Sequence, residues 1–120
     1  MTENSENLNS QAIELAARGE YTEAIACFVQ AISMDRTNYL LWYNLGITYR
    51  DSGNLTGAKV ALEKAYDLNN TDADILESLS LICLSQGELE DAFDYCTEGL
   101  LINQENAHIW NTLGVLHFQK

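Results

Sequence analysis

The chain repeats its residue pattern every 34 positions, and this period constrains its fold more than any other feature. Glycines keep the step at Gly19, Gly53 and Gly87. The same spacing holds for apolar positions, namely Ala24, Ala58 and Ala92; Leu45, Leu79 and Leu113; and Leu8, Trp42, Leu76 and Trp110. A period of this length indicates a stack of similar small units, none of which can bury its apolar face alone. It therefore excludes most enzyme architectures.

Within one period, the apolar residues follow the spacing of two helices. The first helix is indicated by residues at i, i+3, i+4 and i+7, which are Trp42, Leu45, Gly46 and Tyr49. A second apolar face follows Gly53 and consists of Leu55, Ala58, Leu62, Ala65 and Leu68. Glycine suits the left-handed conformation of a chain that leaves a helix, and the segment 69–72 offers N-cap side chains. Each period is therefore predicted to be helix, tight turn, helix and short loop.

The segment 42–49, with the sequence WYNLGITY, resembles the tetratricopeptide repeat (TPR). The pattern of that family is W-x2-L-G-x2-Y followed by A-x3-F-x2-A. The second part is matched by Ala58, Leu62 and Ala65. The family's proline near the end of the repeat is replaced here by Arg36, Asn70 and Gln104. We expect the neighbouring Asn and Asp residues to make these turns instead.

The resemblance covers nearly the whole chain and divides it into four parts. Three full units span 5–38, 39–72 and 73–106, and 107–120 is the first helix of a fourth. The resemblance implies an all-α fold, a right-handed α-solenoid of antiparallel helix pairs with one extra C-terminal helix. About seven helices are expected, in a single TPR domain that spans 1–120.

The charge of the chain limits the partners that it can bind. The net charge is −12, with only 6 basic residues, which disfavours nucleic acid and anionic membranes. The unit 73–106 contains no Lys or Arg. The simpler interpretation is a solvated face that keeps the protein soluble, and the alternative is a patch that attracts a basic partner. The polar N-terminus lacks a signal-peptide pattern, so we expect a cytoplasmic protein.

No residue pattern predicts a metal site, a cofactor or a reaction. The three cysteines, Cys27, Cys83 and Cys96, lack C-x2-C spacing and are expected to be reduced core thiols. His108 and His117 have no Ser, Cys or acidic partner at a spacing typical of catalysis. The sequence therefore predicts a protein that is not an enzyme and that has no metal or cofactor.

The family resemblance implies where a ligand binds. In TPR proteins the first helix of each pair lines a concave groove that takes an extended peptide or a partner helix. The face of each first helix that points away from the Trp-Leu-Gly stripe gives the predicted groove residues. These are Asn9, Ile13, Leu40, Tyr43, Asn44, Ile47, Arg50, Asp74, Glu77, Ser78, Leu81, Leu84, His108, Asn111, Thr112, Val115 and Phe118. Apolar and amide side chains together suit a peptide or helix, although some of them could instead fill space between adjacent repeats.

One TPR subclass binds the C-terminal carboxylate of heat-shock chaperones through Lys and Asn residues on successive first helices. The matching positions here hold Asn9, Ile13, Asn44, Asp74 and Ser78. Shifted by one unit, they hold Tyr43, Ile47, Ser78, His108 and Thr112. Asn44 alone fits, and Asp74 places an anion where a cation is needed. The sequence therefore predicts a groove that is not of the carboxylate-clamp type.

The last helix, 107–120, lacks the second helix that its pattern calls for. We expect Leu113 to anchor it inward and Trp110, Gly114 and His117 to form an exposed edge. The leading prediction for function is a module that binds another protein, with a basic segment as one option for its ligand. The alternative is a structural or oligomerisation segment of a longer TPR protein, which forms a homo-oligomer through residues 107–120.

Overall fold

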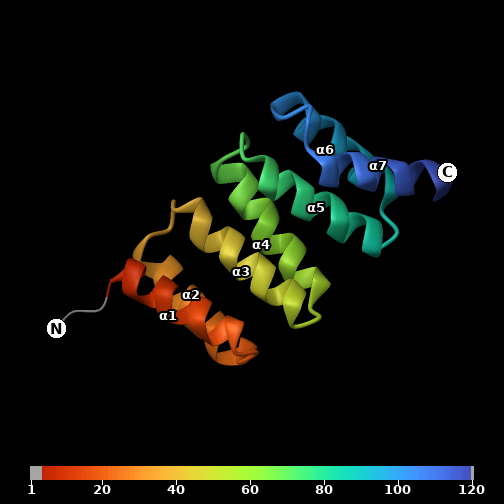
Figure 1. The fold of residues 1–120 in the computed structure, drawn as a ribbon. Helices are drawn as coiled ribbons and strands as arrows, with labels where there is room; N and C mark the ends of the chain where they lie inside the picture. Colours follow the sequence, from red (N-terminus) through yellow and green to blue (C-terminus); the bar gives the residue numbers. More distant parts are fainter. Residues whose placement is uncertain (1–3, 120) are drawn as a thin grey trace. The chain divides into compact units, whose positions relative to one another are not determined.

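The computed structural model describes residues 4–119, with side chains up to His117, and these residues form seven α-helices and no strand. Their bounds are α1 Ser5–Ala17, α2 Tyr21–Met34, α3 Tyr39–Asp51, α4 Leu55–Leu68, α5 Ala73–Ser85, α6 Leu89–Ile102 and α7 Ala107–Gln119 (Figure 1). The predicted all-α fold of repeated helices is confirmed. Among the described helices, none combines the length and the apolar character that crossing a membrane requires.

The helices pack into two compact units, residues 1–68 and 69–120. In the first unit α1 pairs with α2 and α3 pairs with α4, while α2 also packs on α3. In the second unit α5 pairs with α6, and α7 packs on both of them (Figure 1). The first helices begin at residues 5, 39, 73 and 107, which are the starts of the predicted repeats.

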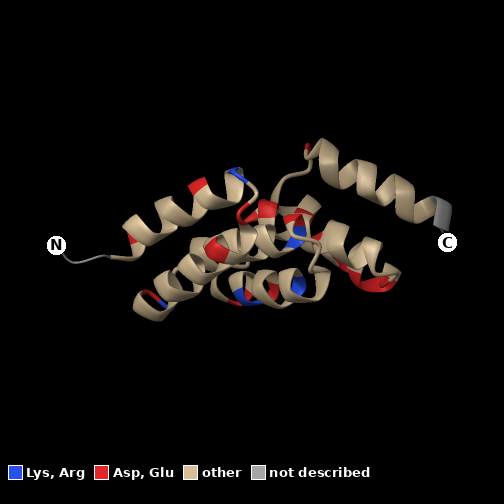
Figure 2. Cartoon of the chain, turned by 90° about the horizontal axis from the view of Figure 1, so that it is seen from below, with Lys and Arg blue, Asp and Glu red and all other residues tan. Residues whose placement is uncertain are grey.

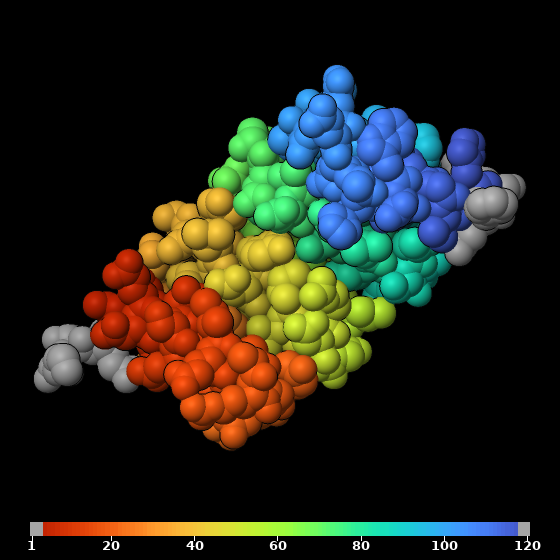
Figure 3. Space-filling model, viewed as in Figure 1, coloured from red at the N-terminus to blue at the C-terminus, as the bar shows by residue number. Residues whose placement is uncertain are grey.

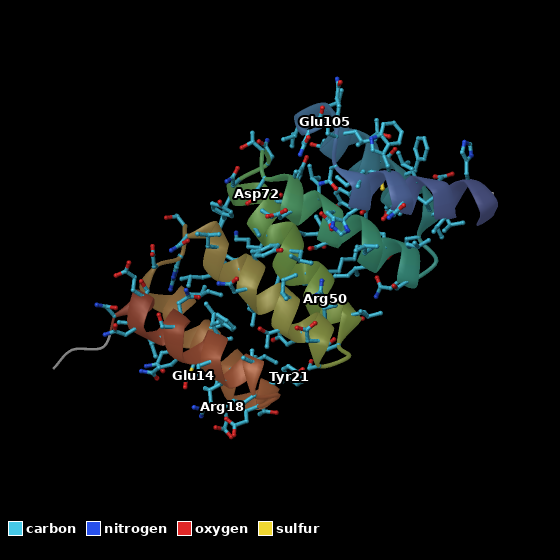
Figure 4. The ribbon with its side chains drawn as sticks, viewed as in Figure 1. Glu14, Arg18, Tyr21, Arg50, Asp72 and Glu105 are labelled. Atoms are coloured by element: carbon cyan, nitrogen blue, oxygen red, sulfur yellow. The ribbon has the colours of Figure 1, made fainter. Side chains whose placement is uncertain are left out.

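A polar side chain caps the start of every first helix, again at a spacing of 34 residues. The side-chain oxygen of Asn4 accepts a hydrogen bond from the backbone N–H of residue 7 at 2.9 Å, and that of Asn38 accepts one from residue 40 at 3.1 Å. Asp72 and Asn106 do the same at 2.9 and 3.1 Å, and Figure 4 shows Asp72 directly before α5. Such caps satisfy backbone donors that have no partner inside the helix.

The turn between the two helices of each pair has one conformation throughout the chain. Gly19, Gly53 and Gly87 have φ angles of 80°, 92° and 77°, which other residues rarely adopt. The N–H of the residue after each glycine donates to a carbonyl five residues earlier, at 2.9, 2.9 and 2.8 Å. This is the hydrogen bond of a Schellman motif, so the predicted left-handed turns are confirmed.

Close approach of α4 to α3 organises the core of the first unit. A Cβ atom built on Gly46 would lie 2.7 Å from Cγ of Leu62 and 3.2 Å from the backbone oxygen of Ala58. Leu62 is completely buried, as are Ala58 and Ala65. Only glycine at position 46 lets the two backbones come this close, because protein interiors have no spare volume. The apolar stripes of α1, α2 and α3 extend the core around this contact.

The core of the second unit contains Cys83, Ala92 and Cys96 from the α5–α6 pair and Ile109 and Leu116 from α7. Ile109 and Leu116 are almost completely buried, whereas Leu113 is half-buried. Leu113 packs against this core, as the prediction of an inward anchor requires, but Ile109 and Leu116 are buried more deeply. Leu113 occupies the same repeat position as Leu45. Leu45 is buried in the first unit, where α3 is paired with α4, whereas no described helix is paired with α7 in this way.

The two tryptophans make the same hydrogen bond in their respective repeats. The indole N–H of Trp42 donates to the carbonyl of Arg36 at 3.2 Å, and that of Trp110 donates to the carbonyl of Gln104 at 2.7 Å. Arg36 and Gln104 are two of the residues that replace the family's proline. The bond ties each loop between repeats to the helix that follows, so these loops are held without a proline.

Gly46 and Gly114 occupy the same repeat position but have different surroundings, which allows a paired test. We expect Gly46→Ala to lower the free energy of unfolding by about 1 kcal/mol, because overpacking costs more than the gain in helix propensity. A Cβ atom on Gly114 would meet no described atom within 4 Å. Gly114→Ala should therefore raise the free energy of unfolding by about 0.5–1 kcal/mol. Urea unfolding of both variants measures this, and shifts of the same sign would contradict the packing described.

Candidate functional site

One aliphatic side chain on each first helix faces outward at the same repeat position. These residues are Ile13, Ile47, Leu81 and Val115, spaced by 34 residues. Ile13 is 49% exposed, Leu81 39% and Val115 44%, while Ile47 is half-buried. We call these four residues the aliphatic row. Exposed aliphatic residues are common singly, but their recurrence at one position of every first helix is not accounted for by the cores of the two units.

Polar side chains connect neighbouring first helices beside the aliphatic row. In the first unit, the side-chain amide of Asn44 on α3 donates to the side-chain oxygen of Asn9 on α1 at 3.0 Å. In the second unit, Nδ1 of His108 on α7 lies 3.9 Å from Oε1 of Glu77 on α5. His108 is strongly exposed and Glu77 is half-buried. Each unit therefore presents aliphatic and hydrogen-bonding groups on adjacent first helices, a combination that suits a peptide backbone and its side chains.

The remaining predicted site residues differ in their exposure. Leu40 and Asn111 are exposed, and Tyr43, Arg50 and Leu84 are half-buried. The guanidinium of Arg50 donates to the carboxylate of Asp51 at 3.2 and 3.3 Å, near the end of α3 (Figure 4). Phe118 lies outside the described side chains.

Ser78 was predicted to line the outward face, but its side chain is buried, with 6% exposed. It lies one helical turn from Ile75 and one turn from Ile82, and both of these are buried in α5. Thr112 is buried in the same way on α7, between Ile109 and Leu116. A search for apolar periodicity counts small polar residues as surface residues. It therefore does not show that the repeat position shared by Ser78 and Thr112 lies on the packed side of the helix.

Charge is distributed unevenly over the two units. Lys and Arg are confined to the first unit, apart from Lys120 at the C-terminus. Among the described residues, the first helices hold a single Lys or Arg, which is Arg50. The second unit has acidic residues along α6, and the described residues of α7 include no Lys, Arg, Asp or Glu (Figure 2). An anionic ligand would therefore meet little positive charge on these faces.

A second apolar feature lies beside α7, away from the aliphatic row. A hollow of about 490 Å³ is lined by Phe93 of α6 and by Trp110, Leu113, Gly114, Leu116 and His117 of α7. Trp110 is 54% exposed, and Gly114 and His117 are also exposed. These are the three residues of the predicted self-association edge. Figure 3 shows part of α7, in blue, at the surface of the second unit.

The cysteines belong to the cores rather than to a site. Cys83 and Cys96 are buried in the second unit, Cys27 is half-buried in the first, and all three are free thiols. Burial raises the pKa of the Cys96 thiol, although a hydrogen bond with the side chain of Ser80 lowers it in part. Within the described residues, no group of three or more His, Cys, Asp or Glu side chains is placed to hold a metal ion.

Comparison with protein families gives two overlapping matches. A family model described as "TPR repeat" matches residues 12–50, and one described as "Tetratricopeptide repeat" matches residues 39–72. Together the two matches cover residues 12–72, about half of the chain. The second match coincides with the unit predicted from the sequence, 39–72.

Among curated proteins, the chain is similar to the mouse BBSome complex member BBS4, with 27% identity over 115 residues. That match covers 96% of this chain and 22% of the mouse protein. The human cilia- and flagella-associated protein 70 is 37% identical over 79 residues, which cover 63% of this chain and 7% of the human protein. The chain thus spans about a fifth or less of the length of these relatives.

Solved structures share the fold at low sequence identity. The first TPR of Spaghetti (RPAP3), bound to the HSP90 peptide SRMEEVD, has a TM-score of 0.92 and 20% identity, and the match covers 97% of this chain and 92% of that one. MamA has a TM-score of 0.91 and 23% identity, and the match covers 97% of this chain and 68% of MamA. At these identities the likeness concerns the fold alone.

Proposed function

Because this chain belongs to the tetratricopeptide repeat family, we propose that it binds a peptide or helical segment of another protein on the outward faces of its first helices. The aliphatic row is the observation that carries this proposal. It gives every first helix one exposed or half-exposed apolar contact at the same position. Hydrogen-bonding groups lie beside the row in each unit. The structure of the RPAP3 domain with its HSP90 peptide is an example of peptide binding by the same fold.

The proposed binding faces keep most of the residues predicted from the sequence. In the first unit they are Ile13, Leu40, Tyr43, Asn44, Ile47 and Arg50. In the second unit they are Glu77, Leu81, Leu84, His108, Asn111 and Val115. Ser78 and Thr112 are left out because both are buried.

We propose that the ligand is not the acidic C-terminus of a chaperone. A terminal carboxylate requires cationic donors, and Arg50, the single described cation of the first helices, is already paired with Asp51. Asn44, the one residue that fits the carboxylate-clamp pattern, donates its amide to Asn9. The acidic α6 adds repulsion for an anionic ligand.

The net charge of −12 favours a ligand with a basic segment and disfavours nucleic acid and anionic membranes. The three free cysteines suit a reducing compartment, so the cytoplasm is the proposed location.

Self-association through α7 is the second candidate function. It is favoured by the exposed Trp110 beside the apolar hollow. We rank it below ligand binding because it concerns one helix, whereas the aliphatic row recurs on four.

The aliphatic row can be tested by charge substitution with matched controls. Peptides would first be selected from a random displayed library on the immobilised chain. Their binding affinity for the chain and its variants would then be measured by fluorescence anisotropy. We expect Ile13→Asp to weaken binding of peptides held by the first unit, and Leu81→Asp that of peptides held by the second unit, at least about tenfold, since each removes an apolar contact and places a charge in the interface. Val60→Asp on α4 and Val29→Asp on α2 are the controls, because both valines are exposed but lie on second helices.

The control variants should bind like the unmodified chain, and circular dichroism should show all four variants folded. Equal binding by the Ile13→Asp and Val60→Asp variants would show that the ligand does not use the first helices.

The proposed ligand preference predicts the outcome of a calorimetric titration. The peptide SRMEEVD, which the RPAP3 domain binds, should give no binding heat with this chain up to about 1 mM. The reason is the lack of free cations on the first helices. A dissociation constant in the micromolar range would instead place the chain among carboxylate-clamp domains.

A further inference from the structure

We propose that the outward face of α5 selects an extended peptide segment with a cationic side chain two residues from an apolar one, and that Glu77 binds the cation. This inference rests on the proposed function above, because it concerns the same binding face. It predicts that the two units prefer different side chains in their ligands.

Glu77 occupies the same repeat position as Asn9, at twice the 34-residue spacing. In the first unit that position is neutral and paired, since the side-chain oxygen of Asn9 accepts a hydrogen bond from the amide of Asn44 at 3.0 Å. The equivalent of Asn44 in the second unit is Thr112, which is buried and whose hydroxyl donates to the backbone carbonyl of His108 at 3.1 Å. The repeat position that supplies an amide donor to Asn9 therefore supplies none to Glu77.

The imidazole of His108 lies near Glu77 but does not form a hydrogen bond with it. Nδ1 of His108 is 3.9 Å from Oε1 of Glu77, which is longer than a hydrogen bond. A histidine side chain is also charged only when it is protonated. A cation from a ligand can therefore bind Glu77 without breaking a hydrogen bond to His108.

Glu77 is half-buried in a unit that is rich in acid. Its side chain is 21% exposed, and a carboxylate that is largely removed from water is stabilised by an opposite charge. Among the described residues of the second unit there is no Lys or Arg to provide that charge. Asp74, which is exposed and lies one turn before Glu77, adds a second negative charge on the same face. A cationic side chain of a ligand is therefore attracted to this place.

An apolar contact lies one helical turn further along the same face. Leu81 follows Glu77 by four residues, which corresponds to about 6 Å along the axis of α5. Leu81 is 39% exposed and belongs to the aliphatic row. In an extended peptide, side chains two residues apart lie on the same side at a spacing of about 6.5–7 Å. Such a peptide can therefore place a cation against Glu77 and an apolar side chain against Leu81.

Arginine suits Glu77 better than lysine does. The guanidinium group is less strongly hydrated than an ammonium group, so moving it to a half-buried place costs less free energy. Two of its N–H groups can also donate to both oxygens of one carboxylate. The ligand that we infer for the second unit is therefore an extended segment in which one residue separates an arginine from an apolar residue.

The first step of the test is a selection of short peptides from a random displayed library on the full chain. Peptides whose binding is weakened by Leu81→Asp are ligands of the second unit, and those weakened by Ile13→Asp are ligands of the first. We expect arginine, and less often lysine, two residues from an apolar residue in the ligands of the second unit. The ligands of the first unit should show no such enrichment, because Asn9 and Asn44 are neutral.

The second step measures the affinity of one arginine-containing ligand of the second unit by fluorescence anisotropy. Glu77→Gln should weaken binding at least about tenfold, since it removes the charge and keeps the shape of the side chain. Glu90→Gln is the matched control, because it removes the same charge from an exposed position on α6, and it should change the affinity less than about twofold. Thermal unfolding should show both variants folded. The Glu77→Lys variant should bind the peptide with its arginine replaced by glutamate more tightly than the unmodified chain does.

Three results would overturn this inference and leave the proposed function standing. The first is equal affinity of the Glu77→Gln and Glu90→Gln variants for the arginine peptide. The second is a set of Leu81-dependent peptides without enrichment of arginine or lysine. The third is a set of peptides that all need Ile13 and never Leu81. If no selected peptide needs either residue, the proposed function itself is wrong, and this inference is wrong with it.

Discussion

The structure depends on the contact of a second helix with the Trp-Leu-Gly face of the first helix in its pair. Gly46 allows α4 to come close enough for Leu62 to be fully buried. Burying one leucine stabilises a fold by about 1.5–3 kcal/mol, and this contact also fixes how the two helices lie against each other. Since one side of α3 is taken by α4, the opposite side is left to hold Ile47 of the aliphatic row.

Much of the fold follows from the sequence because the 34-residue period marks both glycine turns and apolar faces. It places the starts of the first helices at the observed residues and gives the left-handed turns at Gly19, Gly53 and Gly87. The caps at Asn4, Asn38, Asp72 and Asn106 have the same period, but polar positions carry less weight in a search for apolar repeats. N-cap side chains are predicted in the segment 69–72, which contains Asp72, and the same reasoning at the 34-residue period gives Asn4, Asn38 and Asn106.

The site is less predictable, because exposure depends on the neighbouring helices and not on the residue alone. The outward positions of Ile13, Leu81 and Val115 agree with helical geometry. Ser78 and Thr112 are buried because small polar side chains fit between packed helices, and helical spacing cannot tell them from surface residues. Leu113 shows the converse, since a residue whose repeat equivalent is buried stays half-exposed where no described helix covers it.

The role of the second helix is tested most directly by native-state hydrogen exchange. Helix α1 and helix α7 are the first and last of the described first helices, but only α1 is paired with the second helix of its own repeat, α2, whereas α7 packs on α5 and α6 of the preceding repeat. The amides of α7 should therefore exchange at least about tenfold faster than those of α1 and of α3, because local opening exposes less apolar surface. Equal protection of α1, α3 and α7 would show that a first helix does not need its partner, and would contradict this account.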